Sequence, residues 1–552
     1  MVKIWNNILN KEIMKPKKLY IPLMAILIVT GINSCSEDFL NLKPMTNKLD
    51  VNSYITETDA QEALATAYKG FAASNGLENI PIEEDIFSDD AFAGGEPGGG
   101  MKEVWQPIEK GIAPVLTEIR MWQKLWREVY RANTYLGKES GINWTTPGLR
   151  DKMKGEALAL RAYAYWDLER YYGWVPILDG VPNDITSLST VKQNSPDEVY
   201  KFIAKDLLEA MPLLPDNLNS ATDKGHINRD VVRVLMTRIY LYYQNFVKPV
   251  IGVVGGYTIS DEWSDGTTII NKAYVQNLLD VIINSNRYHL LSNYADIFNW
   301  DNQNNEESIF EWQYSAYQNS GNTDDQNGGG NFSVQLYGIR NPKGYDTIYN
   351  GWSFGTVTYS LYNEFEAGDP RRDIAIFNAT VKLKSYSAGF QNTGYFNYKY
   401  MPLTRFSTGA NSAYNWADNF KDMRYAEVLL SASELFLQDN PSKALNYFNQ
   451  VRERAMGTGA ALSTIDIEAI THERRVEFSG EGQRKCYLLE RGLDYTQEKI
   501  DASFNTDLMP ANISKDDYLG RHFNRDTWGM LPIPETEIQL NPNLKQFVPA
   551  YQ

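Results

Sequence analysis

Residues 155–172 read GEALALRAYAYWDLERYY, a run without proline in which Ala and Leu recur at helical spacing. Gly and Ala carry the smallest side chains, and small side chains let two helices approach closely. The stretch therefore predicts a helix that packs against its neighbours in helix-turn-helix units of the tetratricopeptide type. No strict repeat consensus is visible along the chain.

Amphipathic stretches on both sides of this run extend the helical pattern. Ser195-Pro196-Asp197-Glu198 is a capping box with proline at the first helical position, so another helix starts there. Further helices are predicted at 59–72, 120–137, 152–172, 229–245, 272–285, 422–438, 441–456 and 465–483. We expect a mainly α, tetratricopeptide-like scaffold over about 50–290 and 420–500.

A different pattern occupies residues 290–420, between the two helical parts. Residues 294–365 hold sixteen aromatic residues in 72 positions, and charges are scarce from 312 to 363, while Asn, Gln, Gly and Ser are abundant. Disordered segments are poor in aromatics. We therefore expect an ordered, loop-rich, partly β insertion that binds a ligand, with strands near 307–314 and 331–339.

The overall composition narrows the classes of function. The chain has 552 residues, with 53 Lys plus Arg against 69 Asp plus Glu and a formal charge of −16. Nucleic-acid binding depends on basic residues that neutralise phosphates, so this acidity argues against it. Two cysteines and four histidines leave little for disulfides, thiol chemistry or histidine-based zinc sites. The excess lies in aromatics, with 13 Trp, 35 Tyr and 22 Phe.

The N-terminus has the features of a targeting signal. Residues 19–32 form a short apolar run after several lysines, as in a secretory signal and unlike a membrane span. Small residues then lead to Cys35, the arrangement of a bacterial lipoprotein signal. We predict that residues 1–34 are removed and that Cys35 is lipidated; an ordinary signal peptide with an incidental cysteine is the alternative. Translation starts at Met1 or Met14, of which Met14 gives the more usual signal, and the mature charge is then −20.

The sequence contains no recognisable catalytic set. The Gly-rich stretch 94–100 lacks the Gly-Lys-Ser/Thr of a phosphate-binding loop, and neither G-x-S-x-G nor H-E-x-x-H occurs. Glu473, Glu477 and Glu481 recur at every fourth position with arginines nearby, which predicts an ion-pair network that holds helices together. Carboxylate pairs for glycoside hydrolysis stay open, because their separation in space decides them.

The aromatic residues fall into two groups. Rings at helical spacing, such as Tyr163 and Trp166, are predicted to lie in the core. Rings in polar, glycine-rich loops have no obvious apolar partners: Trp105, Tyr314, Tyr317, Tyr345, Tyr349 and Trp352. Trp and Tyr with Asn, Gln and Asp nearby suit a sugar, whose C–H faces stack on rings while its hydroxyls need hydrogen-bond partners.

Short motifs are spread over nearly the whole mature chain. Those of the N-terminal half and the insertion are CSEDFL at 35–40, SDD at 88–90, GEA at 155–157 with RAY at 161–163, YGWVP at 172–176, NEESIF at 305–310 and GDPRR at 368–372. Those of the C-terminal part are RYAEVLL at 424–430, ALN at 444–446 with NQVRERA at 449–455, ERRVEFSGEGQR at 473–484, LPIP at 531–534 and NPNLKQ at 541–546. In this order and at these spacings they resemble the SusD/RagB family of outer-membrane lipoproteins of the Bacteroidota.

The resemblance implies a SusD-like domain over residues 35–552 and a non-catalytic function. Members of the family capture a glycan or oligosaccharide at the cell surface and deliver it to a SusC-like TonB-dependent transporter, which their helical face contacts. Acidic residues after the lipidated cysteine direct such proteins to the cell surface, so we expect a lipid-anchored protein of the outer membrane. The alternatives are a secreted glycoside hydrolase and a peptide- or protein-binding surface lipoprotein.

Ligand residues vary between family members, so loop context and ring chemistry select the candidates. These are Trp105, Trp312, Tyr314, Tyr345 and Trp352, with Asp89 and Asp90 as polar contacts. The mature charge disfavours a strongly anionic ligand through long-range steering, although a local basic patch would reverse this. No cofactor is expected; the acidic stretches 301–307 and 324–325 are candidates for structural calcium, but neither has EF-hand spacing.

Overall fold

The computed structural model describes residues 54–72, 80–96, 121–182, 184–216, 223–316, 329–407, 415–503 and 521–552. The predicted signal of residues 1–34 and Cys35 lie outside these ranges, so their roles stay predictions. Helices are the main elements within them, and none of these helices combines the length and the apolar character needed to cross a membrane.

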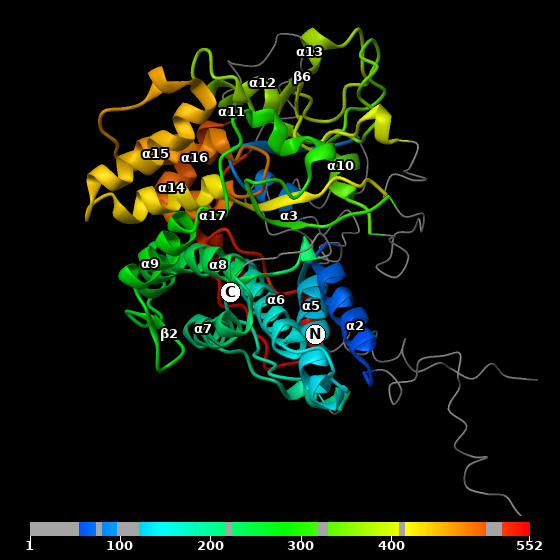
Figure 1. The fold of residues 1–552 in the computed structure, drawn as a ribbon, viewed down its shortest axis with the longest axis vertical. Coiled ribbons are helices and arrows are strands. Elements are labelled where there is room, and N and C mark those ends of the chain that lie inside the picture. Colours follow the sequence, from blue (N-terminus) through cyan, green and yellow to red (C-terminus); the bar gives the residue numbers. More distant parts are fainter. Residues whose placement is uncertain are drawn as a thin grey trace, which may run out of the picture.

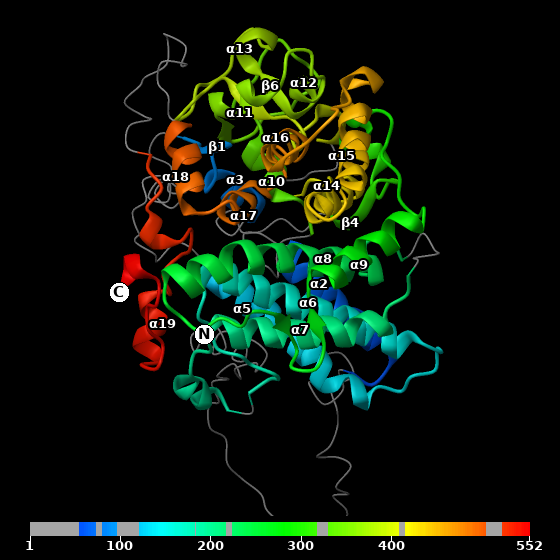
Figure 2. The ribbon, with the colours of Figure 1, turned by 90° about the vertical axis from the view of Figure 1, so that its left-hand side faces the viewer.

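Long helices form the N-terminal scaffold, and each lies within a few residues of its predicted position. They are α2 (Glu57–Ala72), α5 (Met121–Lys138), α6 (Leu149–Tyr172), α7 (Pro196–Leu213), α8 (Arg229–Tyr242) and α9 (Lys272–Asn284). α6 packs between α5 and α7 (Figures 1 and 2). The predicted capping box is present at α7, where the Ser195 side chain accepts from the Glu198 N–H and the Glu198 carboxylate accepts from the Ser195 N–H.

The small residues of α6 allow the predicted close approach of helices. A Cβ atom added to Gly155 would lie only 2.9 Å from Cγ of Leu214, at the end of α7. Further along α6, Arg161 donates from Nε to Asp206 of α7 at 2.7 Å and from Nη1 to Asn133 of α5 at 2.8 Å. The rings that were predicted to lie in the core are buried on α6: Tyr163, Tyr165, Trp166, Tyr171 and Tyr172.

The insertion consists of short strands, short helices and loops. Within the described ranges the strands form two-stranded antiparallel sheets: β1 (Ala91–Gly94) with β5 (Phe354–Val357), β2 (Trp263–Ser264) with β3 (Ile269–Ile270), β4 (Ser308–Trp312) with β8 (Phe420–Arg424), and β6 (Ile376–Asn378) with β7 (Tyr395–Asn397). The short helices are α10 (Phe332–Tyr337), α11 (Tyr359–Glu364), α12 (Arg371–Ala375) and α13 (Ala379–Lys382). β4 confirms the strand predicted near 307–314.

The strand predicted at 331–339 is wrong, because these residues form the short helix α10. The Asn331 side chain accepts from the Ser333 N–H at 3.0 Å and so caps the helix. Every residue of α10 is buried, so the alternation of apolar and polar residues here does not mark a half-exposed strand. Periodicity alone does not distinguish the two structures in so short a segment.

Most of the C-terminal helices lie against the insertion, on the side of α8 away from α7 (Figures 1 and 2), whereas α19 (Glu535–Leu540) lies on the other side, beside the N-terminal scaffold (Figure 2). The others are α14 (Tyr425–Phe436), α15 (Pro441–Met456), α16 (Ile467–Glu477), α17 (Arg484–Glu490) and α18 (Leu493–Ala502). α3 (Ile80–Ile86), although it comes early in the chain, packs against α17. The fold is therefore mainly α with small sheets, as predicted.

The predicted ion-pair network is present, and it joins the insertion to the C-terminal helices. Arg424 of β8 binds Glu307, Glu477 and Glu481 at 2.7, 3.0 and 2.8 Å, and all four side chains are buried. Arg371 of α12 binds Glu473 at 2.5 Å and Glu477 at 3.0 Å. The partners thus come from distant elements and not from the arginines of the same motif.

Candidate functional site

Residues 338–353, here called the aromatic loop, join α10 to β5 and carry the exposed ring of Tyr349 and the half-buried rings of Tyr345 and Trp352. Backbone N–H groups of the loop bind carbonyls of the loop, α10 and the chain at 402: Gly351 to Ile339 at 2.8 Å, Trp352 to Gln335 at 2.9 Å, Ser353 to Gly338 at 2.6 Å and Tyr349 to Pro402 at 2.7 Å. These bonds hold the loop in one shape on the body of the insertion.

Three rings of the aromatic loop each rest on a deeper ring. Tyr349, 45% exposed, lies 5.7 Å from the buried Trp416 between ring centroids. The half-buried Trp352 meets Phe332 edge-on at 5.3 Å, and Tyr345 meets Phe377 edge-on at 5.2 Å. Buried rings thus support these side chains from within, while part of each stays open to solvent, as stacking on a sugar requires.

Polar groups surround the exposed rings. Asn341 donates from its side-chain amide to Ser387 Oγ at 3.0 Å, and its backbone N–H donates to Asn350 Oδ1 at 2.7 Å. Asn341, Asn350 and Ser387 are all exposed, so their remaining donors and acceptors face solvent. The Nε of Arg340 donates to the Trp352 carbonyl at 2.9 Å, and burial lowers the pKa of Arg340 although nearby Glu96 opposes this.

Left-handed backbone conformations of non-glycine residues gather at the loop. Asn341 has φ 47°, Ser353 has φ 59° and Gln391, in the neighbouring segment, has φ 49°. Each such residue costs about 1–3 kcal/mol and persists where its surroundings hold it. Ser353 Oγ accepts from the Arg340 N–H at 3.0 Å, and Gln391 Oε1 accepts from the Gly94 N–H at 3.1 Å. The strained residues therefore help to fix the shape of the surface that presents the rings.

The structure brings only some of the predicted ligand residues to this surface. Tyr345 and Trp352 lie on the aromatic loop. Trp105 lies outside the described residues. Tyr349 was among the loop rings singled out in the sequence, whereas Arg340, Asn341, Asn350 and Ser387 carried no signal, because isolated polar residues in a polar segment have no diagnostic spacing.

Trp312, predicted to contact a ligand, lies away from the aromatic loop and lines a small cavity between the helical scaffold and the C-terminal helices, so its ligand contact stays a prediction. Its indole is 8% exposed and stacks on Phe71 with 5.0 Å between centroids and 5° between planes. Its Nε1 donates to Asp422 at 3.0 Å, so the polar edge is also occupied. Tyr314 is half-buried on the same side and donates from its hydroxyl to the Ala72 carbonyl at 3.0 Å. Both rings join the insertion to the helical scaffold, away from the aromatic loop.

Asp89 and Asp90, predicted as polar ligand contacts, serve the scaffold instead. Both are buried, and Arg475 binds Asp89 and Asp90 at 2.9 Å each while Arg484 binds Asp89 at 2.8 Å. Although burial opposes ionisation, the guanidinium groups of Arg475 and Arg484 hold the pKa of Asp89 below its ordinary value. Carboxylates that are enclosed and fully engaged in this way have no room for a sugar hydroxyl.

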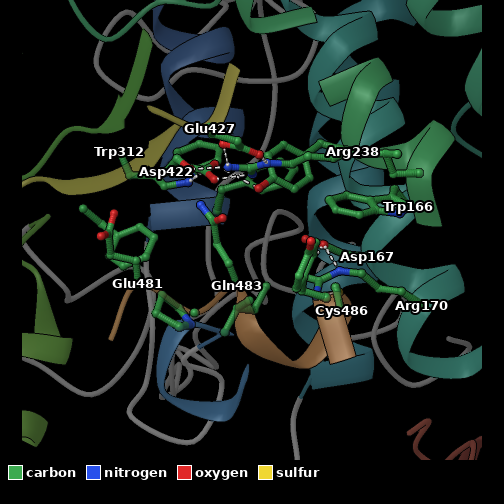
Figure 3. A pocket seen from close by; sticks show the side chains of 18 of the residues that line it. Trp166, Asp167, Arg170, Arg238, Trp312, Asp422, Glu427, Glu481, Gln483 and Cys486 are labelled. Carbon is green, nitrogen blue, oxygen red and sulfur yellow. Dashed lines mark hydrogen bonds and ion pairs between the residues drawn. The ribbon is translucent and has the colours of Figure 1, made fainter. Parts of the chain in front are cut away.

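A cavity of about 110 Å³ lies at the junction of the helical scaffold and the C-terminal helices (Figure 3). Its wall includes Trp166 and Arg170 of α6, Arg238 of α8, and Gln483 beside α17. Ligand pockets usually measure about 300–1,000 Å³, so this cavity is too small for an oligosaccharide. Its charged groups pair across the junction, as when Arg238 binds Asp422 at 2.7 Å, and it belongs to the interior of the fold.

Of the two stretches predicted as candidates for calcium, the structure describes only 301–307. No group of three or more His, Cys, Asp or Glu residues poised for a metal ion occurs within the residues described above. Asp301 forms an ion pair with Arg405 at 2.6 Å, and residues 324–325 lie outside the described ranges. A structural calcium therefore stays a prediction.

Comparison with family models gives two matches that together span most of the chain. A model described as the SusD family matches residues 374–551, and one described as starch-binding and associating with the outer membrane matches residues 38–241. The aromatic loop falls between the two matched segments. The segment that presents the exposed rings thus lies outside both models.

Relatives of similar length support the same assignment. SusD-like protein P25 of Formosa agariphila is 24% identical over 95% of this chain and 97% of its own. A SusD-like protein of Bacteroides ovatus is 24% identical over 97% of this chain and 98% of its own.

Solved structures share the fold. Surface glycan-binding protein A from Bacteroides thetaiotaomicron, in complex with laminarihexaose, superposes with a TM-score of 0.73 at 24% identity, covering 90% of this chain and 100% of that one. A laminarin-binding SusD-like protein superposes with a TM-score of 0.72 at 25% identity, covering 88% and 98%. At this identity the likeness defines the architecture and leaves the ligand to the chain's own residues.

Proposed function

The chain belongs to the SusD/RagB family, and we propose that it is a cell-surface protein that captures a glycan or oligosaccharide on its aromatic loop. The observation that carries this proposal is that one loop presents the exposed ring of Tyr349 and the half-buried ring of Trp352, each supported by a buried ring, together with exposed amide and hydroxyl groups. Sugar rings stack on aromatic faces, and their hydroxyls need hydrogen-bond partners. Two related proteins of this fold are described as binding laminarin or laminarihexaose.

The proposal includes delivery of the glycan to a partner. After loss of residues 1–34, lipid on Cys35 anchors the protein in the outer membrane with its body at the cell surface, and a SusC-like TonB-dependent transporter receives the ligand. The family model described as associating with the outer membrane supports the location. The lipoprotein-type sequence before Cys35 supports the anchor.

The function we propose is non-catalytic. A glycoside hydrolase needs a carboxylic acid with a raised pKa and a second carboxylate across an open cleft. Burial raises the pKa of Glu128, Glu169 and Glu490 to about 8, but Glu128 and Glu169 lie in the interior and Glu490 lines the small cavity between the helices. Glu96 and Asp346 are exposed acids at the aromatic loop, and Glu96 is paired with Arg340 at 3.4 Å.

The test is binding of the purified mature protein to a panel of polysaccharides, by affinity electrophoresis and calorimetry. Tyr349→Ala and Trp352→Ala should each weaken retention about threefold to tenfold, because each removes a stacking surface worth about 0.5–1.5 kcal/mol together with its contact area. The matched control is Tyr274→Ala, which removes a half-buried ring from α9. We expect the control to bind like the unaltered protein.

The other candidate functions have distinct signatures in the same test. Release of reducing sugar would identify a hydrolase, and retention of peptides without retention of any glycan would identify a peptide-binding protein. If no polysaccharide is retained, or if the control loses as much affinity as the two loop variants, the proposal is overturned.

A further inference from the structure

Basic side chains gather at one end of the aromatic loop. Lys343 belongs to the loop, and Lys382 and Lys384 lie in and after α13; together with Arg340 they are here called the basic corner. Lys343 and Lys384 are exposed. This concentration of positive charge stands out in a chain with a formal charge of −16.

Backbone contacts hold the basic corner together. Lys343 donates its N–H to the Ser385 carbonyl at 2.8 Å, and Lys384 donates its N–H to the Lys343 carbonyl at 2.8 Å. Gly344 has φ +84°, and a Cβ atom added there would lie 2.7 Å from Cβ of Lys384. The absent side chain of Gly344 therefore leaves room for the Lys384 side chain. The two lysines are brought together by the fold and not by adjacency in the sequence.

The ammonium groups of Lys343 and Lys384 form no ion pair with a described residue, in contrast to Arg340, which binds Glu96 at 3.4 Å. The Nζ of Lys382 lies 5.1 Å from the Phe377 ring centroid and 5.5 Å from that of Tyr398. Asp346 is the exposed acid within the loop itself. Positive charge thus exceeds negative charge at this corner, and Tyr345, which also packs on Phe377, lies within it.

We infer that the glycan bound by the aromatic loop carries carboxylate or sulfate groups, which Lys343 and Lys384 bind while the neighbouring rings stack on the sugar. This inference rests on the proposed function and adds the chemical class of the ligand. A local positive field attracts anionic groups even on an acidic protein, because the Debye length at physiological ionic strength is about 8 Å. A lysine ammonium group acts as a point charge, so it can bind a planar carboxylate or a tetrahedral sulfate.

The experiment compares polysaccharides that share a backbone and differ in charge. One pair is polygalacturonate and its methyl ester, and the other is κ-carrageenan and its desulfated form; laminarin is the neutral reference. The anionic member of at least one pair should bind about tenfold more tightly than its neutral partner at low salt. This preference should shrink at about 1 M salt, where the Debye length is about 3 Å. The pair that shows the preference distinguishes carboxylate from sulfate.

Substitution assigns the effect to the basic corner. The double variant Lys343→Gln with Lys384→Gln should lose about fivefold or more in affinity for the anionic glycan and leave binding of neutral glycans unchanged. The matched control is Lys192→Gln with Lys201→Gln, two exposed lysines at α7, which lies at the opposite end of the molecule from α13 (Figures 1 and 2). It removes the same charge and should bind like the unaltered protein.

The two proposals fail in different ways. Equal binding of charged and neutral partners, or equal losses in the lysine variant and its control, would overturn the inference and leave glycan binding in place. Absence of binding to every polysaccharide, laminarin included, would overturn both.

Discussion

The phenol ring of Tyr349 lies against the indole of Trp416, with 5.7 Å between their centroids. Tyr349 is 45% exposed and Trp416 only 1% exposed, so the pair reaches from the surface into the core of the insertion. Trp416 in turn donates from Nε1 to Gln335 of α10 at 3.2 Å and packs edge-on against Trp300. The candidate ligand surface is therefore built on a buried aromatic layer.

Replacement of Trp416 by alanine should lower the free energy of unfolding by about 3–5 kcal/mol, because it leaves a large cavity in a fully buried site. Tyr349→Ala should cost less, about 1 kcal/mol, because nearly half of the residue is exposed and its loss leaves no enclosed cavity. Urea unfolding followed by tryptophan fluorescence and circular dichroism measures both. Equal losses of stability would contradict the division into a structural and a ligand-facing ring.

The Arg424→Met variant should be destabilised by about 3–5 kcal/mol or fail to fold, because Glu307, Glu477 and Glu481 would be left buried without their shared cation. The control is Arg405→Met, whose ion pair with Asp301 is exposed and should contribute less than about 1 kcal/mol. Thermal unfolding of the two variants provides the comparison. If Arg424→Met lowers the melting temperature no more than Arg405→Met does, the buried carboxylates do not need their shared cation.

Asp85 should make stability depend on pH. Burial, opposed by the hydrogen bond that Tyr337 donates, raises the pKa of Asp85 to about 8. Between the unfolded pKa of about 4 and this value the folded protein keeps a proton that the unfolded chain has lost, so the free energy of unfolding falls as pH rises, by up to about 1.4 kcal/mol per pH unit. Asp85→Asn should remove this contribution and gain stability relative to the unaltered protein at pH 8. Denaturant unfolding from pH 5 to pH 8 measures it, and parallel curves for the two proteins would refute it.

Two glycines test the close packing of the helical scaffold. Gly155→Val should cost about 1–3 kcal/mol, because the new side chain would collide with Leu214. Gly137→Ala, in α5, has nothing within 4 Å of the added Cβ and should be neutral or stabilising by up to about 1 kcal/mol. Calorimetric melting of both variants gives the comparison. Tolerance of valine at Gly155 would mean that α6 and α7 can separate without loss.

The helices could be predicted from the sequence because their signals are local. The capping box at Ser195 and the apolar spacing of residues 155–172 depend on neighbours within one or two turns, and both match the structure. The acidic residues Glu473, Glu477 and Glu481 were also correctly interpreted as a network, although α16 ends at Glu477 and Glu481 lies in the turn that follows it. Their partners, Arg371 and Arg424, could not be predicted, because they come from other elements.

Which rings face solvent could not be predicted from the sequence, because ring exposure depends on tertiary packing. Trp312 and Trp352 look alike in the sequence, but Trp312 stacks on Phe71 from α2 and is buried, whereas Trp352 stays half-open on the aromatic loop. The sequence does not show that Asp89 is enclosed, because Arg475 and Arg484, which bind it, come from a distant part of the chain.

The sequence by itself determined the helical scaffold, the family and the concentration of rings in the insertion, since these follow from periodicity, motif order and composition. Only the tertiary structure decided which rings face solvent and which charges stand together. Lys343 and Lys384 meet through backbone hydrogen bonds, and the missing side chain of Gly344 leaves room for the Lys384 side chain. A net charge summed along the chain therefore disfavours an anionic ligand, whereas the local field at the basic corner favours one, because electrostatic interactions in solution act over about 10 Å or less.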